Sequence, residues 1–499
     1  MPTLIFRHWL IKPALFISVI LLFLNLLPGW LGVKSAYLLT DKFILLLMIM
    51  LVIIVTYIRR HEHLCQPWRQ VFQRKISMAA IIFLLAYLIV GLLDSVHFRL
   101  PLPAEHNKPV HYSVDVKSLL DILATDLHSK VEKTYSAPFA TQLFSRESVD
   151  KPDGSSVRIY PRLKFGGVHL KDPVADKMAD ILKRLSIAIL WSIGITLLFI
   201  LLFVLRQSFY QRVSVRLLLI RFLNGRFKLP WRTAAMCCWL ILFIVLFIAD
   251  AGSFYHILGT DKVGQDVLYL SVKSIRTGLV IGTLTTLVML PFAIMLGVVA
   301  GFFRGWIDDI IQYIYTTLNS IPGVLLIAAA ILSIDVYIAN HPDMFSTTIE
   351  RADLRLLALC FILGITSWTG LCRLLRGESF KLRELEYIQA AEAFGVKKMR
   401  IIRKHIIPNI SHIVLIVVVL DFSGLVLAEA VLSYVGVGVD PSTNSWGNMI
   451  NGARLEMARE PMVWWSLVAA FSFMFILVLS ANLFSDAVRD AFDPHMQRK

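Results

Sequence analysis

Long blocks of hydrophobic residues alternate along the chain with shorter polar loops. A helix that crosses a bilayer needs about 20 apolar residues, and the blocks are close to this length. Because lipid offers no partner for backbone polar groups, such blocks must form α-helices. Ten blocks meet this description: 13–31, 42–58, 76–94, 185–205, 234–250, 277–303, 310–334, 354–375, 410–435 and 463–484. The pattern predicts an all-α polytopic membrane protein with about ten transmembrane helices.

The composition supports this fold class. Hydrophobic residues make up 57% of the 499 residues and charged residues 17%, against roughly 45–50% and about 25% in globular proteins. These values argue against a soluble enzyme. The formal net charge of +15 does not indicate nucleic-acid binding, because Lys and Arg accumulate in the cytoplasmic loops of membrane proteins. We expect the lipid bilayer as a partner and no nucleic acid.

The first block, 13–31, has two interpretations. Arg7 and Lys12 precede its apolar stretch, as basic residues do in a secretory signal peptide. The stretch is long for a signal peptide, and no convincing small-x-small cleavage site follows it. We therefore expect a retained transmembrane helix.

The charges of the loops predict the orientation. Lys and Arg concentrate in the loops at 59–75, 206–233 and 376–409. If every span is real, these three loops lie on one side of the membrane, and the positive-inside rule makes that side cytoplasmic. The loops on the other side carry few positive charges. Ten spans then place both termini in the cytoplasm.

The segment 97–184 interrupts the helical pattern. It is polar, and its positive and negative charges nearly balance. Val157–Tyr160 is typical of a strand, Leu119–Val131 is typical of an amphipathic helix, and Pro-Asp-Gly at 152–154 signals a turn. On the predicted topology this segment is a small extracytoplasmic α+β insertion. Four of its histidines, His106, His111, His128 and His169, lack metal-ligand spacing, and we interpret them as ordinary surface residues.

The chain carries no recognisable catalytic motif. It contains no Gly-x4-Gly-Lys-Ser/Thr phosphate loop, no His-Glu-x-x-His and no Gly-x-Ser-x-Gly. Four of the five cysteines fall inside or at the end of apolar blocks, which argues against a disulfide scaffold and a Cys-based metal site. We predict that this chain is not an enzyme and holds no metal or cofactor.

The loop 376–409 has the most informative sequence. Residues 387–394 favour a short helix with a centre of small residues, and Gly395 ends it. A second, basic helix is predicted over 397–406, and it stops before Pro408, where the next span begins. A short helix with a small-residue face suits docking into a groove of a cytoplasmic partner. The alternative is a solvated amphipathic loop.

This loop resembles the EAA loop of the permease subunits of bacterial ABC importers. The family pattern is Glu-Ala-Ala-x3-Gly-x9-Ile-x-Leu-Pro, and this chain has Gln389 in place of Glu, His405 in place of Ile and Ile407 in place of Leu. In the family, the loop contains the coupling helix that sits in a cleft of the ATPase subunit. The resemblance implies an ATPase-coupling role for Glu386, Tyr387, Gln389, Ala390, Ala391, Gly395 and Pro408.

Further motifs resemble the dipeptide, oligopeptide and nickel branch of that family. The run 259–267 is similar to the Gly-Thr-Asp-x-x-Gly-Arg-Asp signature before the second core helix, with Gln265 in place of Arg. The runs 427–438, 445–447 and 489–494 resemble the fifth core helix, its outer loop and the family's end. The implied signature residues are Gly259, Thr260, Asp261, Gly264 and Asp266.

The resemblance covers about half of the chain, in the right order, and suggests four regions. The N-terminal part has no counterpart in the family, and we expect it to form an accessory unit beside the core. The regions are a three-helix membrane segment at 1–96, the extracytoplasmic module at 97–184, a fourth span with a basic linker at 185–233, and a permease core of six spans at 234–494.

The resemblance implies a transport subunit of an ATP-driven importer in the bacterial cytoplasmic (inner) membrane. Such a subunit forms half of the translocation pore, and partner chains bind ATP and magnesium. The implied partners are a second homologous permease, two ATP-binding subunits and an extracytoplasmic substrate-binding protein. ATPase closure would switch the pore between two states. Peptides, nickel chelates and peptide-like antibiotics share this branch, so we expect peptides or peptide-like substrates without fixing which.

A few polar or helix-breaking residues lie inside the spans. A carboxylate at that depth costs on the order of 3 kcal/mol, so Asp421 and Glu429 should face the bundle or a water-filled cavity. Either acid lines a pathway or is paired for packing. Pro322 and Pro291 interrupt two spans, and such breaks either line a translocation path or are tolerated kinks. Asp421, Glu429 and Pro322 are the candidate pathway residues.

Two other classes of function remain as alternatives. One is an ion- or proton-coupled carrier that works without an ATPase and uses Asp421 as its coupling acid. The other is a membrane sensor or scaffold that uses the module at 97–184 to bind a ligand. Nucleotide dependence discriminates, because only the ABC permease requires a separate ATPase.

Overall fold

The computed structural model describes residues 34–492 apart from 61, 103–110, 151–155 and 345–346. Nine helices in this part of the chain are long and apolar enough to cross a membrane. They correspond to nine of the ten predicted blocks, and the block at 13–31 lies outside the described residues. The all-α polytopic fold class is confirmed.

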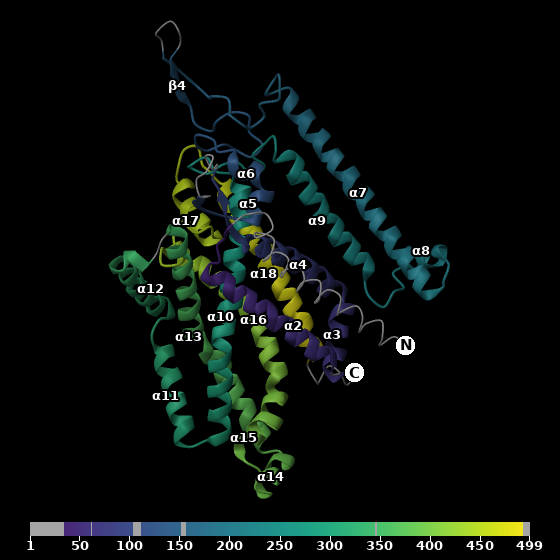
Figure 1. Ribbon diagram of the computed structural model, residues 1–499, viewed down its shortest axis with the longest axis vertical. Helices are drawn as coiled ribbons and strands as arrows, with labels where there is room; N and C mark the ends of the chain where they lie inside the picture. Colours follow the sequence, from purple (N-terminus) through teal and green to yellow (C-terminus); the bar gives the residue numbers. More distant parts are fainter. Residues whose placement is uncertain (1–33, 61, 103–110, 151–155, 345–346, 493–499) are drawn as a thin grey trace.

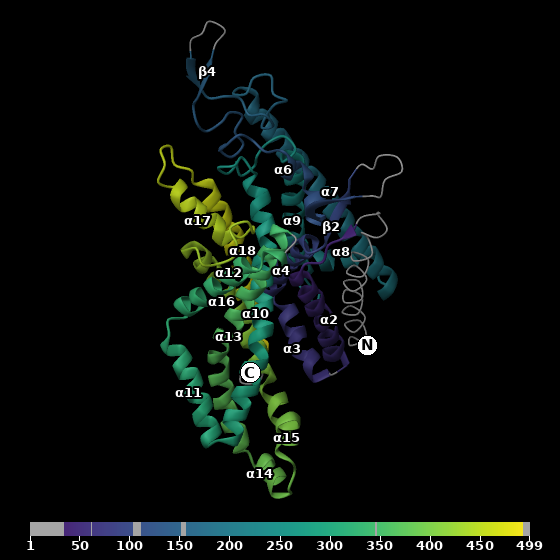
Figure 2. The same cartoon turned by 60° about the vertical axis from the view of Figure 1, so that its left-hand side comes forward.

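Four long helices of the second half form the centre of the molecule. They are α10 (Val267–Phe303), α13 (Thr348–Arg383), α16 (Ile407–Val435) and α18 (Trp465–Phe492). α10 packs along α13 on one side and contacts α16 and α18 on the other. Buried aliphatic residues such as Ile281, Leu284 and Leu359 fill the contact between α10 and α13. This packing makes α10 the central element, as Figures 1 and 2 show.

The two prolines predicted to interrupt spans behave differently. The block 310–334 is divided into α11 (Trp306–Ser320) and α12 (Gly323–Asn340), with Ile321 extended before Pro322. A residue that precedes proline is driven away from helical backbone angles, which explains the break. Pro291 instead lies inside the continuous α10, so the expected interruption there is wrong. Neighbouring packing holds α10 together across the missing N–H.

The N-terminal helices surround this centre. α4 (Lys75–Asp94) packs against α18, α10 and α9, while α2 (Leu39–Arg60) packs against α13. α7 (Asp176–Gln211) and α9 (Trp231–Ala251) lie along each other, joined by the short α8 (Val215–Leu223). α3 (Glu62–Gln73) links α2 to α4. In Figure 1 the α7–α9 pair lies to one side of the central helices.

The polar segment folds as an α+β module at one end of the molecule. β1 (Lys34–Ser35), β2 (His97–Pro101) and β3 (Tyr112–Ser118) form an antiparallel sheet, and β4 (Glu147–Asp150) pairs with β5 (Ser156–Ile159). The predicted strand near 157–160 is confirmed. The sheet also recruits β1 from outside the predicted 97–184 boundary.

The helix predicted over Leu119–Val131 is two short helices instead. α5 (Leu119–Leu123) and α6 (Thr125–Ser129) are separated at Ala124, whose backbone is not helical. The Thr125 hydroxyl donates to backbone carbonyls of the preceding turn, and such bonds compete with helix continuation.

The opposite end of the molecule carries α14 (Glu386–Ala393), as Figures 1 and 2 show. The predicted stop before Pro408 is wrong, because α15 (Lys398–Ile401), a π-helical turn η2 (Ile402–Ile406) and α16 run on without a break. A proline ring crowds the carbonyl four residues earlier, and the wider π turn accommodates it. Two smaller elements are η1 (Pro342–Met344) and α17 (Trp446–Glu456).

Candidate functional site

α14 is a short helix fixed by one buried side chain. Ile388 is fully buried, within a cluster that includes Phe302 of α10 and Ile402 of η2. Ala391 is half-buried against the same cluster, whereas Ala390 and Glu386 are exposed. The helix therefore has an anchored face and a free face, as docking to a partner requires.

Gly395 ends α14 through its backbone conformation. Its φ of +71° lies in the left-handed region, which residues with a Cβ disfavour. The N–H of Val396 donates to the carbonyl of Ala391, and the N–H of Gly395 donates to that of Glu392, so the chain reverses in a Schellman-type turn. No described atom lies within 4 Å of a Cβ placed at Gly395. The left-handed backbone conformation, and not crowding by other described atoms, explains why glycine occupies position 395.

The departure from the family pattern at Gln389 has a local explanation. Its side-chain amide donates to the backbone carbonyl of Glu384, 3.2 Å away, at the C-terminal end of α13. An ionised Glu at this position has no proton to donate. On the same helix, the Tyr387 hydroxyl accepts a hydrogen bond of 3.1 Å from Asn409. Gln389 and Tyr387 thus join α14 to the two long helices that flank it.

Ion pairs stiffen the base on which α14 stands. The Arg376 guanidinium of α13 contacts the Asp308 carboxylate of α11, with Nη2 and Oδ2 2.7 Å apart. Arg383 donates to the carbonyl of Phe302 over 2.9 Å, and Arg304 pairs with Glu384. Pro408 is exposed in the first turn of α16. The adjoining ends of α10, α11 and α13 are therefore joined beside α14.

The signature loop, residues 259–266, is shaped by its two carboxylates. Asp266 is the N-cap of α10, and its Oδ1 accepts from the backbone N–H groups of the first helical turn at 2.8 and 3.2 Å. Oδ1 of Asp261 accepts from two N–H groups inside the loop, at 2.9 and 2.8 Å. Gly259 begins the loop with a φ of +73°. The residues of the Gly-Thr-Asp-x-x-Gly-x-Asp pattern thus form a closed turn that leads into α10.

The module forms direct hydrogen bonds with the signature loop. The Thr260 hydroxyl donates to the carbonyl of Thr134 over 2.9 Å and accepts from the N–H of Ser136 over 2.6 Å. Gly264 has a φ of +81°, and a Cβ there would lie 1.9 Å from the carbonyl oxygen of Glu132. The signature loop and the module segment 132–136 are therefore in backbone contact.

A buried histidine joins the same two units. His256 Nδ1 lies 2.8 Å from Asp266 Oδ2, and its Nε2 lies 3.6 Å from Glu132 Oε1, an ion-pair distance that exceeds a hydrogen bond. Burial lowers the pKa of His256, but the two carboxylates outweigh burial and raise it to about 9. Burial raises the pKa of Glu132, but the hydrogen bonds to its carboxylate outweigh burial and bring this pKa below the ordinary value for Glu. The module is thus clamped to the core by a protonated histidine between two carboxylates.

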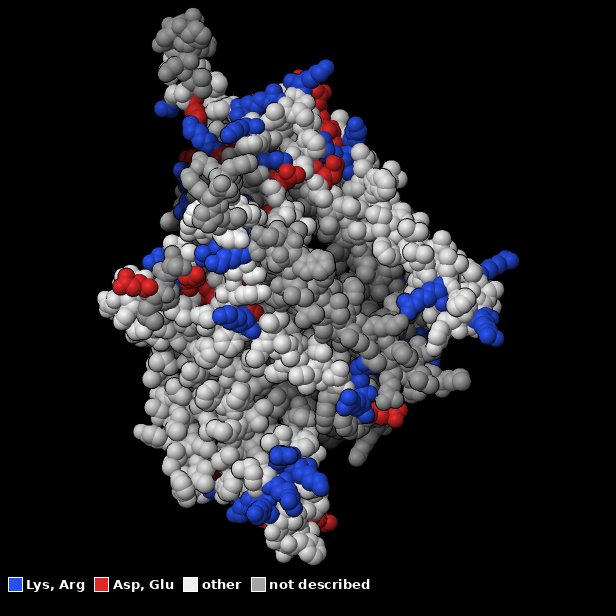
Figure 3. Space-filling model, in the orientation of Figure 1, with Lys and Arg blue, Asp and Glu red and all other residues white. Residues whose placement is uncertain are grey.

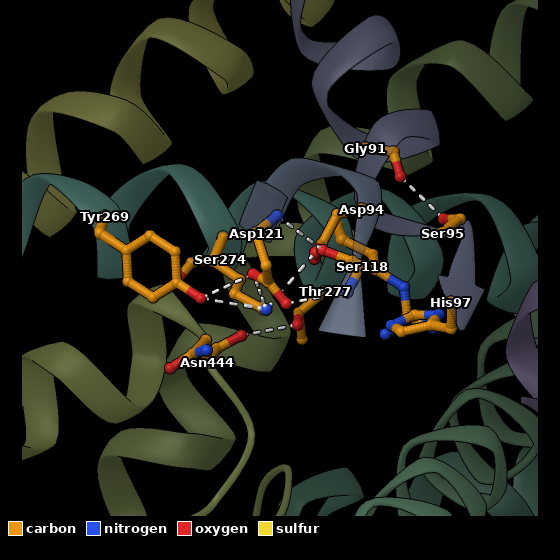
Figure 4. Close-up of polar contacts among 12 residues, drawn as sticks. Gly91, Asp94, Ser95, His97, Ser118, Asp121, Tyr269, Ser274, Thr277 and Asn444 are labelled. Atoms are coloured by element: carbon orange, nitrogen blue, oxygen red, sulfur yellow. Dashed lines mark hydrogen bonds and ion pairs between the residues drawn. The ribbon is translucent and has the colours of Figure 1, made fainter. Parts of the chain in front are cut away.

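A second contact between the units consists of charges that the sequence analysis missed. Lys273 of α10 pairs with Asp121 of the module and lies 3.7 Å from Asp94 at the end of α4. The Tyr269 hydroxyl donates to Asp121 over 2.7 Å, and the N–H of Ser118 donates to the same carboxylate over 2.9 Å. Figure 4 shows Asp121 between Tyr269 and Ser118, with Asp94 alongside.

The neighbouring cation of α10 has partners on two other helices. Arg276 Nη2 donates to Asp41 of α2 over 2.7 Å and lies 3.7 Å from Asp353 of α13. His97 Nδ1 lies 2.8 Å from the other oxygen of Asp41. All these groups are buried, so each charge depends on its partners. Charges at span ends are the only sequence signal, and no motif connects them.

A cavity of about 320 Å³ opens beside these charges. Lys273, Arg276, Asp94 and Asp353 line one part of it, and apolar residues such as Leu356 line another. The module, the N-terminal helices and the core all contribute to the wall.

The candidate pathway residues do not line this cavity. Glu429 is 1% exposed and accepts a hydrogen bond of 2.8 Å from Ser433, which favours packing over contact with a passing substrate. Asp421 is partly exposed, and no hydrogen bond or ion pair joins it to another described residue. Pro322 is exposed at the break between α11 and α12. Among the described residues, no group of His, Cys, Asp and Glu has the arrangement of a metal site.

These features define a multi-pass membrane protein with a short anchored helix, α14, at the end opposite the module. Residues 293–498 match the family model of the binding-protein-dependent transport system inner membrane component. The chain is 33% identical over 242 residues to the dipeptide transport system permease protein DppC of Alkalihalophilus pseudofirmus, covering 48% of this chain and 73% of that protein. It is 29% identical over 239 residues to the oligopeptide transport system permease protein OppC of Mycobacterium tuberculosis, covering 48% and 76%.

The chain belongs to the family of inner membrane components of binding-protein-dependent transport systems. The family resemblance drawn from the EAA-like loop is confirmed, and the protein is a transport permease subunit of the ABC importer type. Among solved structures, the MetNI methionine ABC transporter in an inward-facing conformation covers 45% of this chain and 97% of its own, with 17% identity and a TM-score of 0.35.

Proposed function

We propose that this protein is a permease subunit for the ATP-driven import of peptides or peptide-like molecules. The observation that carries the proposal is α14, whose free face projects at the end of the molecule opposite the module (Figure 1). Relatives named as dipeptide and oligopeptide permeases support the substrate class. The chain forms half of the pore and transmits ATPase closure through α14.

The partners follow from this role. α14 docks into a cleft of one of two ATP-binding subunits, which hold ATP and magnesium and hydrolyse the nucleotide. A second, homologous permease completes the pore, and an extracytoplasmic binding protein delivers the substrate. Asp421 and the exposed break at Pro322 are the described residues we assign to the pathway, since both have surfaces free to meet a substrate or the second permease.

We propose that α14 lies in the cytoplasm and the module outside, with both termini cytoplasmic in the bacterial inner membrane. The basic residues beside α14 support this arrangement, since Lys and Arg favour the cytoplasmic side. Lys171 is exposed on the module, so a label at this position reports which side of the membrane the module occupies. A cysteine introduced there should react with an impermeant maleimide in intact spheroplasts. If the cysteine reacted only after lysis, the module would lie in the cytoplasm and the proposed topology would be wrong.

The coupling role is tested by placing a charge on the free face of α14. Ala390→Asp leaves the buried Ile388 anchor untouched, so the protein should assemble normally but lose substrate-stimulated ATP hydrolysis and uptake. Ala175→Asp makes the same change at an exposed site on the module and should leave both activities intact. Full uptake in Ala390→Asp would contradict the assignment. Uptake without any ATPase subunit would indicate an ion-coupled carrier.

A further inference from the structure

The segment 206–233 carries an unusual concentration of unpaired positive charge. It contains no Asp or Glu. Its seven cations are all exposed, and none forms an ion pair with another residue in the described part of the chain: Arg206, Arg212, Arg216, Arg221, Arg226, Lys228 and Arg232. Arg304 and Arg376 at the base of α14 differ, because both are paired with carboxylates. The cations around α8 therefore lack a counter-charge within the described protein.

The turn into α8 is fixed by the backbone. Arg212 ends α7 in a left-handed conformation with a φ of +53°, and the Ser208 hydroxyl donates to the carbonyl of Val213 over 2.6 Å. α8 then packs on the neighbouring helices through Leu218 and Phe222, which are both buried. α8 is thus held in one orientation, with its opposite face directed outward.

The outward face of α8 is apolar at its centre and basic at its margins. Leu217, Ile220 and Leu223 are 42%, 49% and 60% exposed. At about 100° per residue, Leu217 and Ile220 lie on the helix surface between Arg216 and Arg221, and Leu223 lies about 20° beyond Arg216. Aliphatic residues flanked by arginines are typical of helices that lie in the membrane interface, where the side chains extend their charges to the headgroups.

Aromatic residues accompany the charges at this end of the α7–α9 pair. The rings of Phe203 and Trp231 are 4.7 Å apart between centroids, and Phe227 lies 6.3 Å from Phe203. Phe209 and Tyr210 are 91% and 66% exposed on the last turn of α7. Tryptophan and tyrosine concentrate at the level of lipid headgroups, so this end of the pair is expected to lie at that level.

Ion pairs, a cation–π contact and a hydrogen bond lie at the other end of the α7–α9 pair. There, Arg184 pairs with Asp250 over 3.2 Å and stacks on Phe254 at 3.7 Å, while the Tyr255 hydroxyl donates to Asp180 over 2.9 Å. In Figure 3 the basic residues of α8 stand out at the side of the molecule, away from the mixed charges of the module. The described part of the chain supplies no counter-charge for them, so a bound anion would come from elsewhere.

We propose that α8 and its flanking arginines bind the phosphate groups of anionic phospholipids and thereby hold the inner end of the α7–α9 pair. The positive charge of this segment favours an anionic partner. Because α8 lies between two membrane spans, we infer that this anion is a lipid and not a soluble molecule. Arginine suits the role because its guanidinium forms paired hydrogen bonds with phosphate oxygens.

The test compares lipid binding by the purified full chain and a charge variant. Native mass spectrometry measures retention of phosphatidylglycerol and of phosphatidylcholine with the same acyl chains. Wild type should retain phosphatidylglycerol preferentially. The double variant Arg216→Gln, Arg221→Gln should lose roughly thirty-fold in affinity for it, which corresponds to about 1 kcal/mol for each cation at an anionic surface. The control Arg158→Gln, Lys171→Gln removes two exposed charges from the module and should behave as wild type.

A second measurement separates lipid binding from a folding defect. Hydrogen exchange of residues 206–232 should slow when wild-type protein moves from phosphatidylcholine to phosphatidylglycerol nanodiscs, and the double variant should show no such change while its module remains protected. Equal retention of both lipids by wild type would overturn the proposal. Displacement of phosphatidylglycerol by an excess of inorganic phosphate would also overturn it, because the site would then be a phosphate site and not a lipid site.

Discussion

The buried histidine between the module and the core makes the attachment of the module depend on pH. His256 lies between Asp266, which begins α10, and Glu132, which belongs to the module. We expect His256→Gln to loosen the module at neutral pH, because glutamine keeps a polar side chain but carries no positive charge. No other cationic side chain forms an ion pair with either carboxylate among the described residues.

The magnitude follows from the difference between the folded and ordinary pKa of the imidazole. Burial lowers the pKa of His256, yet Asp266 and Glu132 raise it from 6.5 to about 9. This difference corresponds to about 3 kcal/mol of stability in favour of the protonated, folded form. Because the folded pKa is the higher one, the contribution is complete below pH 6.5. It declines as the pH rises toward 9 and is absent well above that value.

Hydrogen exchange of the backbone at 132–144 reports the opening of the module locally. After correction for intrinsic exchange, wild type should lose most of the 3 kcal/mol, about 2–3 kcal/mol, between pH 6 and pH 9. His256→Gln should show lower protection at pH 6 and little change with pH. Constant protection of wild type across this range would refute the clamp. The same pH-dependent loss in the variant would assign the titration to another group.

Three further predictions concern the same contacts and α14. Gly264→Ala should destabilise the module by about 2–4 kcal/mol in thermal unfolding, because the methyl group strains a left-handed backbone and meets a module carbonyl. Gly424→Ala, in open space within a helix, is the matched control. A double-mutant cycle of Asp121→Asn and Lys273→Met should give a coupling of about 2–3 kcal/mol, and additive effects would contradict a direct pair. Gln389→Glu should speed hydrogen exchange in α14, since a carboxylate donates no hydrogen bond, and unchanged exchange would show that the bond contributes nothing.

The membrane spans were predictable because the bilayer imposes their length and polarity. Nine blocks correspond to apolar helices, although packing decides details that hydropathy does not contain. Pro322 divides a block into two helices, whereas Pro291 lies inside a continuous one. Because proline occupies both positions, the residue type alone does not predict which span is divided. Both prolines are exposed, and the difference arises because α10 packs against several neighbours along its length, whereas α11 and α12 have fewer.

The candidate site was predictable where its residues are close in the chain. The EAA-like loop and the signature loop are each read within a few residues, and their turns depend on local bonds such as the N-cap of Asp266. The charged contacts between module and core were not predictable. Asp41 and Asp353 meet at Arg276 from helices far apart in sequence, and no local pattern distinguishes them from other charges at span ends.

The distribution of these charges bears on the role of the N-terminal half. The core contributes Lys273, Arg276 and Asp353, so its own residues leave one positive charge in excess. Asp41, Asp94 and Asp121 come from the N-terminal half and bury their carboxylates against the two cations. Unpaired charges in such a site are strongly destabilising. A core with Lys273 and Arg276 at these positions therefore depends on the N-terminal half for its counter-charges, and this half is integrated with the permease at the end of α10 that lies beside the module.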